Sequence, residues 1–282
     1  MSPDPSRRDV VAGALGAGFA LAVQPVAATT RTTPADGLDA GDIHIPTATG
    51  AIAGYRAVPA ARQGKAPVVL VVHEIFGVHE HIKDVCRRFA KAGFFAVAPD
   101  LFGRQGDVSK LTEFKEIQTQ VVAKVPDAQV LGDLDATVAW AATTGAADTA
   151  RVGINGFCWG GRMVWLYAAH SRALKAGVAW YGRLVGDPDA TRPRHPLEVA
   201  ATLRAPVLGL YGGQDQGIPL ATVEQMTAKL AAGTAAARRS KIQVYPDAGH
   251  AFFADYRPSY RAEAAADAWS RALAWLRANG VG

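Results

Sequence analysis

The sequence predicts an α/β protein with a mostly parallel central sheet and helices on both faces. Hydrophobic residues make up 49% of the chain and charged residues 20%, the composition of a folded globular protein with ample material for a core. Apolar runs rich in β-branched residues alternate with segments of helical periodicity, which is typical of a parallel sheet. With no internal repeat or low-complexity tract, residues 42–282 are expected to form one domain after a polar linker at residues 29–41.

The clearest strand in the first half of the chain is at residues 68–72. All of its residues are Val or Leu, as expected of a strand that is buried on both faces of a parallel sheet. Residues 82–92 predict a helix, because their apolar positions share one face and Gly93 follows. The other strands are expected at residues 43–45, 51–58, 94–98, 151–155, 176–180, 207–211 and 241–245, and the other helices at residues 112–124, 127–142, 162–170, 221–232 and 259–278.

The charge of the chain does not indicate a nucleic-acid partner. The formal net charge is +5. The first 28 residues hold two basic and two acidic residues, so the remainder also carries +5. The basic residues are scattered, and the short cluster of Arg238, Arg239 and Lys241 is more typical of a solvated face than of a nucleic-acid footprint.

Residues 1–28 have the pattern of an export signal. Arg7 and Arg8 stand just before an apolar, Gly- and Ala-rich run at residues 11–23, and small residues follow up to Ala28. This order predicts a signal peptide, and the adjacent arginines favour the twin-arginine type. An uncleaved anchor is the weaker alternative, because the run is shorter than the ~20 residues that span a bilayer. We expect cleavage after about Ala28 and a periplasmic or secreted mature protein.

The segment Gly156-Phe157-Cys158-Trp159-Gly160 is the strongest sign of an active site. It lies between a predicted strand and a predicted helix. Its form, G-x-C-x-G, is the nucleophile elbow of the α/β-hydrolase fold with cysteine in place of serine. The glycines avoid Cβ collisions at the sharp turn, and a helix N-terminus lowers the pKa of a thiol. Cys158 is therefore the predicted nucleophile.

Asp215 and His250 follow Cys158 in the order that this fold uses. Each lies on the loop after a predicted strand, at the sheet edge where open α/β sheets bind ligands. The order nucleophile, acid, histidine is that of the α/β-hydrolases. We predict that Cys158 attacks an acyl carbon and forms a thioester, that His250 moves the protons and that Asp215 orients the imidazole.

The backbone N–H groups of Trp159 and Ile75 are the predicted oxyanion hole. Purely structural roles are the alternative for the three side chains. Cys158 would then be a small buried hydrophobe, Asp215 a helix cap or turn residue, and His250 an ordinary loop histidine. Their joint order along the chain favours the catalytic interpretation.

No metal or cofactor is expected. His73 and Glu74 begin like the zinc motif H-E-x-x-H, but Gly77 replaces the second histidine and the segment follows a strand. The two cysteines do not have a metal-binding spacing. Cys86 lies on the apolar side of an amphipathic segment, which favours a place in the core.

Further motifs surround these residues. They are His73-Glu74-Ile75-Phe76-Gly77, Ala98-Pro99-Asp100-Leu101-Phe102, Tyr181-Gly182 and Ala248-Gly249-His250. Together with the cysteine elbow, they make residues 43–276 resemble the dienelactone hydrolase family. The resemblance implies a carboxymethylenebutenolidase-like activity, in which water opens an enol lactone to give a keto acid. It also implies that Glu74 contacts the nucleophile and helps to control its ionisation, with an ordinary surface carboxylate as the alternative.

The resemblance further implies that two arginines hold a substrate carboxylate. Arg104 matches the first, although an ordinary loop arginine is the alternative, and Ala254 stands where the second is expected. Arg257 or Arg183 is a candidate substitute. Because paired arginines are a large part of carboxylate recognition, this departure leaves the dienelactone substrate open but does not touch the hydrolytic machinery. The predicted pocket walls are Phe76, Trp159, Tyr181 and Phe253.

We therefore expect an exported, monomeric hydrolase that opens an enol lactone or cleaves a small ester. The first alternative is a general carboxylesterase or thioesterase on the same triad. The second is a non-catalytic binding protein, because a fold does not prove a function, but the complete triad argues against it. The expected partners are a small-molecule lactone or ester and the twin-arginine export machinery, with no stable membrane anchor.

Overall fold

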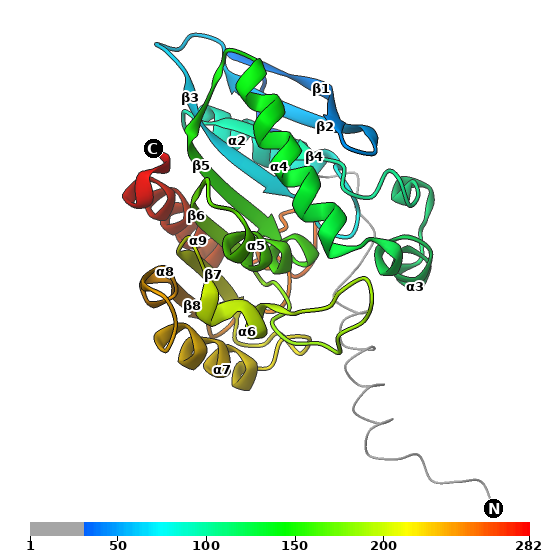
Figure 1. Cartoon of the computed structure of the whole chain (residues 1–282), viewed down its shortest axis with the longest axis vertical. Coiled ribbons are helices and arrows are strands. Elements are labelled where there is room, and N and C mark those ends of the chain that lie inside the picture. The colour runs from blue at the N-terminus through cyan, green and yellow to red at the C-terminus, as the bar shows by residue number, and fades with distance from the viewer. Residues whose placement is uncertain (1–30) are drawn as a thin grey trace, which may run out of the picture.

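The computed structural model describes residues 31–282, and within them eight strands form one sheet (Figure 1). Their order across the sheet is β1-β2-β4-β3-β5-β6-β7-β8. β1 and β2 are antiparallel to their neighbours, and all later pairs are parallel. The strands are β1 (Leu38–Thr47), β2 (Gly50–Pro59), β3 (Ala66–Val72), β4 (Phe95–Pro99), β5 (Ala147–Phe157), β6 (Leu174–Trp180), β7 (Val207–Gly212) and β8 (Lys241–Tyr245).

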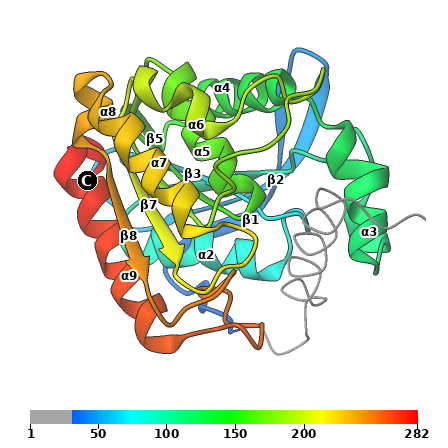
Figure 2. The same cartoon turned by 90° about the horizontal axis from the view of Figure 1, so that it is seen from below.

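Helices cover both faces of the sheet. Figure 2 shows α2 and α9 on one side, with α4, α5, α6 and α7 on the other. The helices are α2 (Glu80–Lys91), α4 (Asp127–Thr143), α5 (Trp159–His170), α6 (Pro196–Val199), α7 (Leu220–Ala231), α8 (Ala235–Arg239) and α9 (Ala262–Leu276). This arrangement confirms the predicted α/β class and its parallel sheet with helices on both faces.

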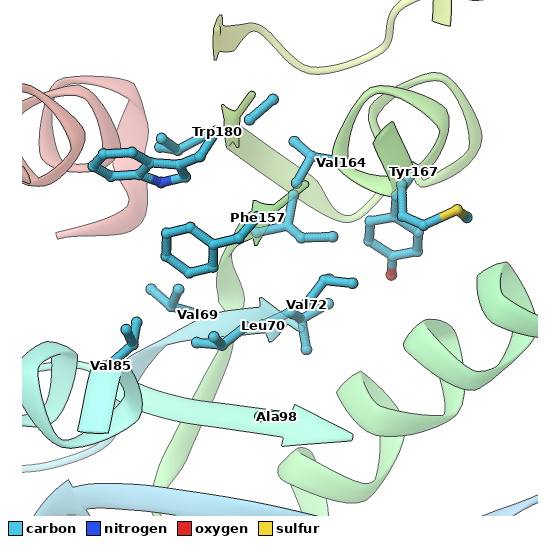
Figure 3. Close-up of a cluster of buried hydrophobic side chains, with 14 of the residues drawn as sticks. Val69, Leu70, Val72, Val85, Ala98, Phe157, Val164, Tyr167 and Trp180 are labelled. Atoms are coloured by element: carbon cyan, nitrogen blue, oxygen red, sulfur yellow. The ribbon is translucent and has the colours of Figure 1, made fainter. Parts of the chain in front are cut away.

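The core lies on both sides of β3. Every residue of this strand is buried, as its continuous apolar run predicts. In Figure 3 its side chains lie among residues of both helical layers and of the neighbouring strands, labelled as Val85, Val164, Phe157 and Trp180. Close packing on both faces fixes where each parallel strand ends, and so fixes the loops that follow the strands.

The predicted end of the linker is wrong. The expected linker at residues 29–41 already contains the start of β1 at Leu38. The chain before that strand is also docked on α2, because the Thr33 backbone N–H donates to Asp84 and Arg87 Nε donates to the Thr33 carbonyl at 2.8 Å. Local polarity indicated a linker, whereas contacts with residues about fifty positions later decide the structure.

The single helix expected at residues 112–124 is also wrong. The segment is broken into α3 (Phe114–Glu116), the wide π turn η2 (Ile117–Val121) and the 3₁₀ turn η3 (Val122–Lys124), after the short η1 (Val108–Lys110). Its β-branched residues are weak helix formers, so burial of Ile117, Val121 and Val122 decides the backbone geometry. Four short elements were not predicted, namely η1, α6, α8 and η4 (Ala200–Thr202), and the closing helix ends in η5 (Arg277–Val281).

The parallel strands direct their carboxyl ends to one edge of the sheet. The loops that follow β3, β5, β6, β7 and β8 therefore meet at this edge, which is where ligands bind in open α/β sheets. Among the described residues, no helix combines the length and apolar character that a membrane crossing requires. The predicted signal at residues 1–28 lies outside the described residues.

Candidate active site

Cys158 occupies a strained turn between β5 and α5. Its backbone has φ 54° and ψ −113°, a conformation that costs a non-glycine residue free energy and is concentrated at functional sites. The turn is held from both sides, because the Cys158 N–H donates to the Trp180 carbonyl at 2.9 Å and the Arg162 N–H donates to the Cys158 carbonyl at 3.1 Å. The sharp strand-to-helix turn predicted from the G-x-C-x-G pattern is confirmed, and the role of Cys158 as the nucleophile stays a prediction.

Glycine at position 160 permits the turn because another strand lies directly against it. A Cβ atom there would lie 2.6 Å from the His73 carbonyl oxygen, closer than real Cβ contacts, and would also collide with Val72. The end of β3 therefore touches the start of α5. This contact brings Ile75, on the loop after β3, to the same cavity as Cys158.

His250 and Asp215 form a buried pair beside the nucleophile. His250 Nδ1 lies 2.7 Å from Asp215 Oδ2, and both side chains are almost wholly buried. The Gly217 backbone N–H donates to the other carboxylate oxygen of Asp215 at 2.9 Å. Because Asp215 is fixed at both oxygens, it holds the imidazole in one orientation, with Nε2 as the ring nitrogen left for the nucleophile.

The pKa of His250 reflects this pairing. Burial alone would lower it, but the charges of Cys158 and Asp215, and hydrogen bonds with both, raise the pKa of His250 to about 10. A histidine with this pKa is a strong base. The three predicted side chains therefore interact directly, although they are far apart in the sequence.

A cavity of about 100 Å³ opens above these residues. Cys158, His250, Ile75, Trp159 and Tyr181 were all expected at the site and do line it. Trp159 is the first residue of α5, and a backbone N–H at that position has no partner within its own helix. The placement suits the predicted oxyanion hole, whose role in catalysis stays a prediction.

Five further residues of this cavity were not predicted. They are Gln118, Val122, Arg162, Arg192 and His195. Arg183, which the sequence offered as a candidate substitute for the second arginine, also lines the cavity. The other five lie on irregular segments or on a helix face, where no motif marked them.

Glu74 is buried and held by residues other than the thiol. Tyr256 Oη donates to Glu74 Oε2 at 2.6 Å, and His79 Nε2 lies 3.3 Å from the same oxygen. Burial would raise the pKa of Glu74, but the hydrogen bond with His79 and the charge of Arg257 outweigh it and hold this pKa well below its usual range. A carboxylate stabilised in this way is a weak base, and its expected control of Cys158 stays a prediction.

The expected contact of Arg104 with the substrate stays a prediction. Arg104 is not among the lining residues of the cavity beside Cys158. Its guanidinium forms an ion pair with Asp133 of α4, and Nη1 donates to Thr47 Oγ1 at 3.2 Å. The Asp133 carboxylate is almost wholly buried, so it needs a cation, and Arg104 supplies the charge.

Two of the expected pocket walls also lie elsewhere. Phe253 stacks on Phe157 with ring centroids 5.4 Å apart and lies 4.4 Å from the Trp180 ring, within the core. Phe76 lines a separate cavity of about 560 Å³, and the Arg257 guanidinium lies 4.8 Å from its ring centroid. The position of each residue in the sequence therefore did not reveal whether its ring faces the cavity beside Cys158.

No group of three or more potential metal ligands occurs within residues 31–282. The two cysteines are both free thiols. Cys86 is buried in the core, as expected, and burial raises the pKa of its thiol far above the usual range. Among residues 31–282, Cys158 is therefore the thiol that lines a cavity open to a substrate.

Known proteins resemble this chain over nearly its whole length. The sequence model of the Dienelactone hydrolase family matches residues 52–280. A protein of Methylorubrum extorquens, provisionally named a carboxymethylenebutenolidase, is 64% identical over 98% of this chain and 94% of its own. A protein of Escherichia coli K12 with the same name is 51% identical over 93% of this chain and 96% of its own. A crystal structure from Klebsiella pneumoniae, provisionally named a dienelactone hydrolase, has a TM-score of 0.82 at 51% identity and covers 85% of this chain and 98% of its own.

Proposed function

Because the chain belongs to the dienelactone hydrolase family and is a carboxylic ester hydrolase of that type, we propose that it opens an enol lactone or cleaves a small ester through Cys158, His250 and Asp215. The observation that carries this proposal is the interaction of His250 with both Asp215 and Cys158 at one cavity. A nucleophile, a base and an orienting acid are all present, each on the loop where the fold positions it.

The first half of the reaction transfers the acyl group to sulfur. The Cys158 thiolate attacks the carbonyl carbon, and the N–H groups of Trp159 and Ile75 stabilise the oxyanion. The carbon–oxygen bond of the ester then breaks. Protonated His250 gives its proton to the departing oxygen, which in a lactone stays attached to the acyl chain. The product of this step is a thioester on Cys158.

The second half hydrolyses the thioester. Neutral His250 takes a proton from a water molecule, whose oxygen attacks the thioester carbon. The carbon–sulfur bond breaks, the carboxylic acid leaves, and Cys158 returns as a thiolate beside protonated His250. Asp215 stabilises the imidazolium in both halves without itself taking a proton.

A general carboxylesterase or thioesterase remains the second candidate because of Arg104. Arg104, one of the two arginines that the resemblance implied for a substrate carboxylate, is ion-paired with Asp133, and Ala254 stands at the position of the other. The triad is compatible with either substrate. The choice between lactone and simple ester therefore depends on the other residues of the cavity.

Trapping of the acyl-enzyme tests the proposed mechanism. The purified protein of residues 29–282 would react with cis-dienelactone and with 4-nitrophenyl acetate, be quenched in acid, and be digested for mass spectrometry. We expect acyl mass on the peptide that contains Cys158 and release of that mass by hydroxylamine, which cleaves thioesters. Steady turnover with no adduct, or an adduct on another residue, would contradict the thioester mechanism.

We further propose that residues 1–28 direct export through the twin-arginine machinery. The support is the Arg7-Arg8 pair before the apolar run. Expression in a bacterial host should give a mature protein beginning near Thr29 in the periplasm or medium. Replacing both arginines by lysine should leave the uncleaved protein inside the cell, as shown by fractionation and N-terminal sequencing. Export of the double-lysine variant at the normal level would argue for another route.

A further inference from the structure

The strand β8 lies at one edge of the sheet. It pairs with β7 on one side, and no strand among residues 31–282 lies beyond it on the other. Its residues are exposed or only partly buried, whereas every residue of β7 is buried. An edge strand presents unpaired backbone groups to other chains, and natural proteins therefore protect most such edges.

The backbone groups that face the open edge are those of Ile242 and Val244. In the ladder with β7, the Gly213 N–H donates to the Tyr245 carbonyl at 2.8 Å, so Tyr245 directs its backbone groups toward β7. Successive residues of a strand direct these groups to opposite sides, so Ile242 and Val244 direct theirs outward. Gln243 Nε2 donates to the Val244 carbonyl at 2.9 Å, and that oxygen keeps a second lone pair for another donor.

β8 lacks the features that usually protect an edge strand. Its sequence is Lys-Ile-Gln-Val-Tyr, which has no proline and, apart from Lys241 at its start, no charge. The strand at the other edge, β1, carries Pro46 and the charges of Asp39 and Asp42. Because proline and charged side chains oppose pairing with a further strand, β8 is the edge that is open to a partner strand.

The charges around β8 are complementary to those of a second copy of the same strand. Three exposed basic residues gather at its start, namely Arg238, Arg239 and Lys241. Its end borders a cavity lined by three acidic residues and one arginine, and Asp247 and Glu263 among them are exposed. Antiparallel pairing of two copies brings each basic end to the acidic end of the partner, whereas parallel pairing would bring like charges together.

A groove beside the open edge widens the surface that a second copy can contact. It has a volume of about 310 Å³ and lies between β8 and α9. Ile242 of the strand lines it together with Ala274, Trp275 and Ala278 of the closing helical segment. A stable dimer needs a larger contact than one short strand provides, and this mainly apolar groove continues the contact from the strand onto the helix.

We propose that β8 is a dimer interface, at which two copies of this chain join their sheets in antiparallel direction through Ile242 and Val244. The partner is a second copy because both the strand and its charged ends are complementary to themselves about a twofold axis. The proposal replaces the monomer that the sequence led us to expect. It does not depend on the hydrolytic activity.

Sedimentation equilibrium of the purified protein of residues 29–282 tests the dimer. We expect twice the mass of the chain at micromolar concentration. Val244→Pro should raise the dissociation constant about 10- to 100-fold, because it removes one outward N–H from each copy. This N–H takes no part in the ladder with β7, so the fold should be kept, which circular dichroism would check. A wild type that is monomeric at all concentrations, or a folded variant that dimerises equally well, would overturn the proposal.

Lys241→Glu tests the same interface without a change in the backbone. The side chain is exposed, and its reversed charge would meet the acidic end of the partner, so the dissociation constant should rise about 10-fold. Lys115→Glu is the matched control, because Lys115 is also exposed but lies on α3, far from β8 in both views (Figure 1; Figure 2). Equal dissociation constants in the two variants would refute the antiparallel arrangement.

Hydrogen exchange followed by NMR identifies the surface at which the dimer forms. The amides of Ile242 and Val244 should exchange about 10-fold more slowly at high protein concentration than at low concentration, because the partner strand protects them. The Gln243 amide is the internal control, since it faces β7 in the monomer and in the dimer. A dimer whose Ile242 and Val244 amides stay unprotected would have its interface elsewhere and would refute the proposal.

Discussion

Cys158→Ala is expected to lower kcat for lactone and ester hydrolysis by about 10⁴- to 10⁶-fold. The substitution removes the sulfur on which the proposed acyl-enzyme forms, whereas the proposed oxyanion hole and the cavity remain. The residual rate should equal that of a site that only binds and polarises the carbonyl. Stopped-flow and long-incubation assays of 4-nitrophenyl acetate hydrolysis, with the thermal unfolding midpoint as a check on folding, would measure the loss. Activity within 10-fold of the wild type would exclude Cys158 as the nucleophile.

The same variant should change the ionisation of His250. The charge of Cys158 is the largest of the contributions that raise the pKa of His250 from its ordinary 6.5 to about 10, so its removal should lower this pKa. A raised pKa in the folded state stabilises the protein fully below pH 6.5, and this stabilisation is lost as the pH rises through about 10. In Cys158→Ala the stabilisation should be smaller and its loss should be complete at a lower pH, because the folded-state pKa of His250 is lowered while its unfolded-state pKa is unchanged. An imidazole titration followed by NMR that is identical in both proteins would contradict the Cys158–His250 interaction.

The main parts of the site could be predicted because they depend on chain order. Cys158 is marked by two glycines whose absence of side chains lets the turn form, and this requirement is local. Asp215 is marked by the buried strand β7 before it and His250 by the edge strand β8, since parallel strands end at one edge of the sheet. Strand periodicity and turn chemistry are properties of neighbouring residues, so a single sequence reveals them.

The remaining features depend on partners far away in the chain. Arg104 was predicted as a substrate ligand, and only the fold shows that it forms an ion pair with Asp133 of α4. Gln118 and Val122 reach the cavity from a segment that was predicted as one regular helix and that packing breaks into several turns. Ion pairs and irregular backbone of this kind are set by tertiary contacts, which propensity and periodicity do not encode.

Asp215→Asn should reduce kcat for both substrate classes by about 10⁴-fold while the fold is kept. Asparagine fits the same space, but its amide group can donate to Nδ1, which favours the imidazole tautomer with the proton on Nε2. That nitrogen would then face Cys158 as a donor and could not take the thiol proton. Loss of the carboxylate charge also removes one of the contributions that raise the pKa of His250. The expected result is a loss in kcat with a much smaller change in KM.

Asp247→Asn separates this effect from a general effect of charge near the site. Asp247 is exposed and lies three residues before His250 on the same loop, whereas Asp215 is buried and hydrogen-bonded to His250 Nδ1 at 2.7 Å. The two variants make the same chemical change, so only the hydrogen bond to the imidazole distinguishes them. If both variants lost activity equally, the negative charge near the site would be responsible, and not the orientation of His250 by a hydrogen bond. A loss confined to Asp215→Asn would show that the hydrolase depends on the tautomer that Asp215 selects.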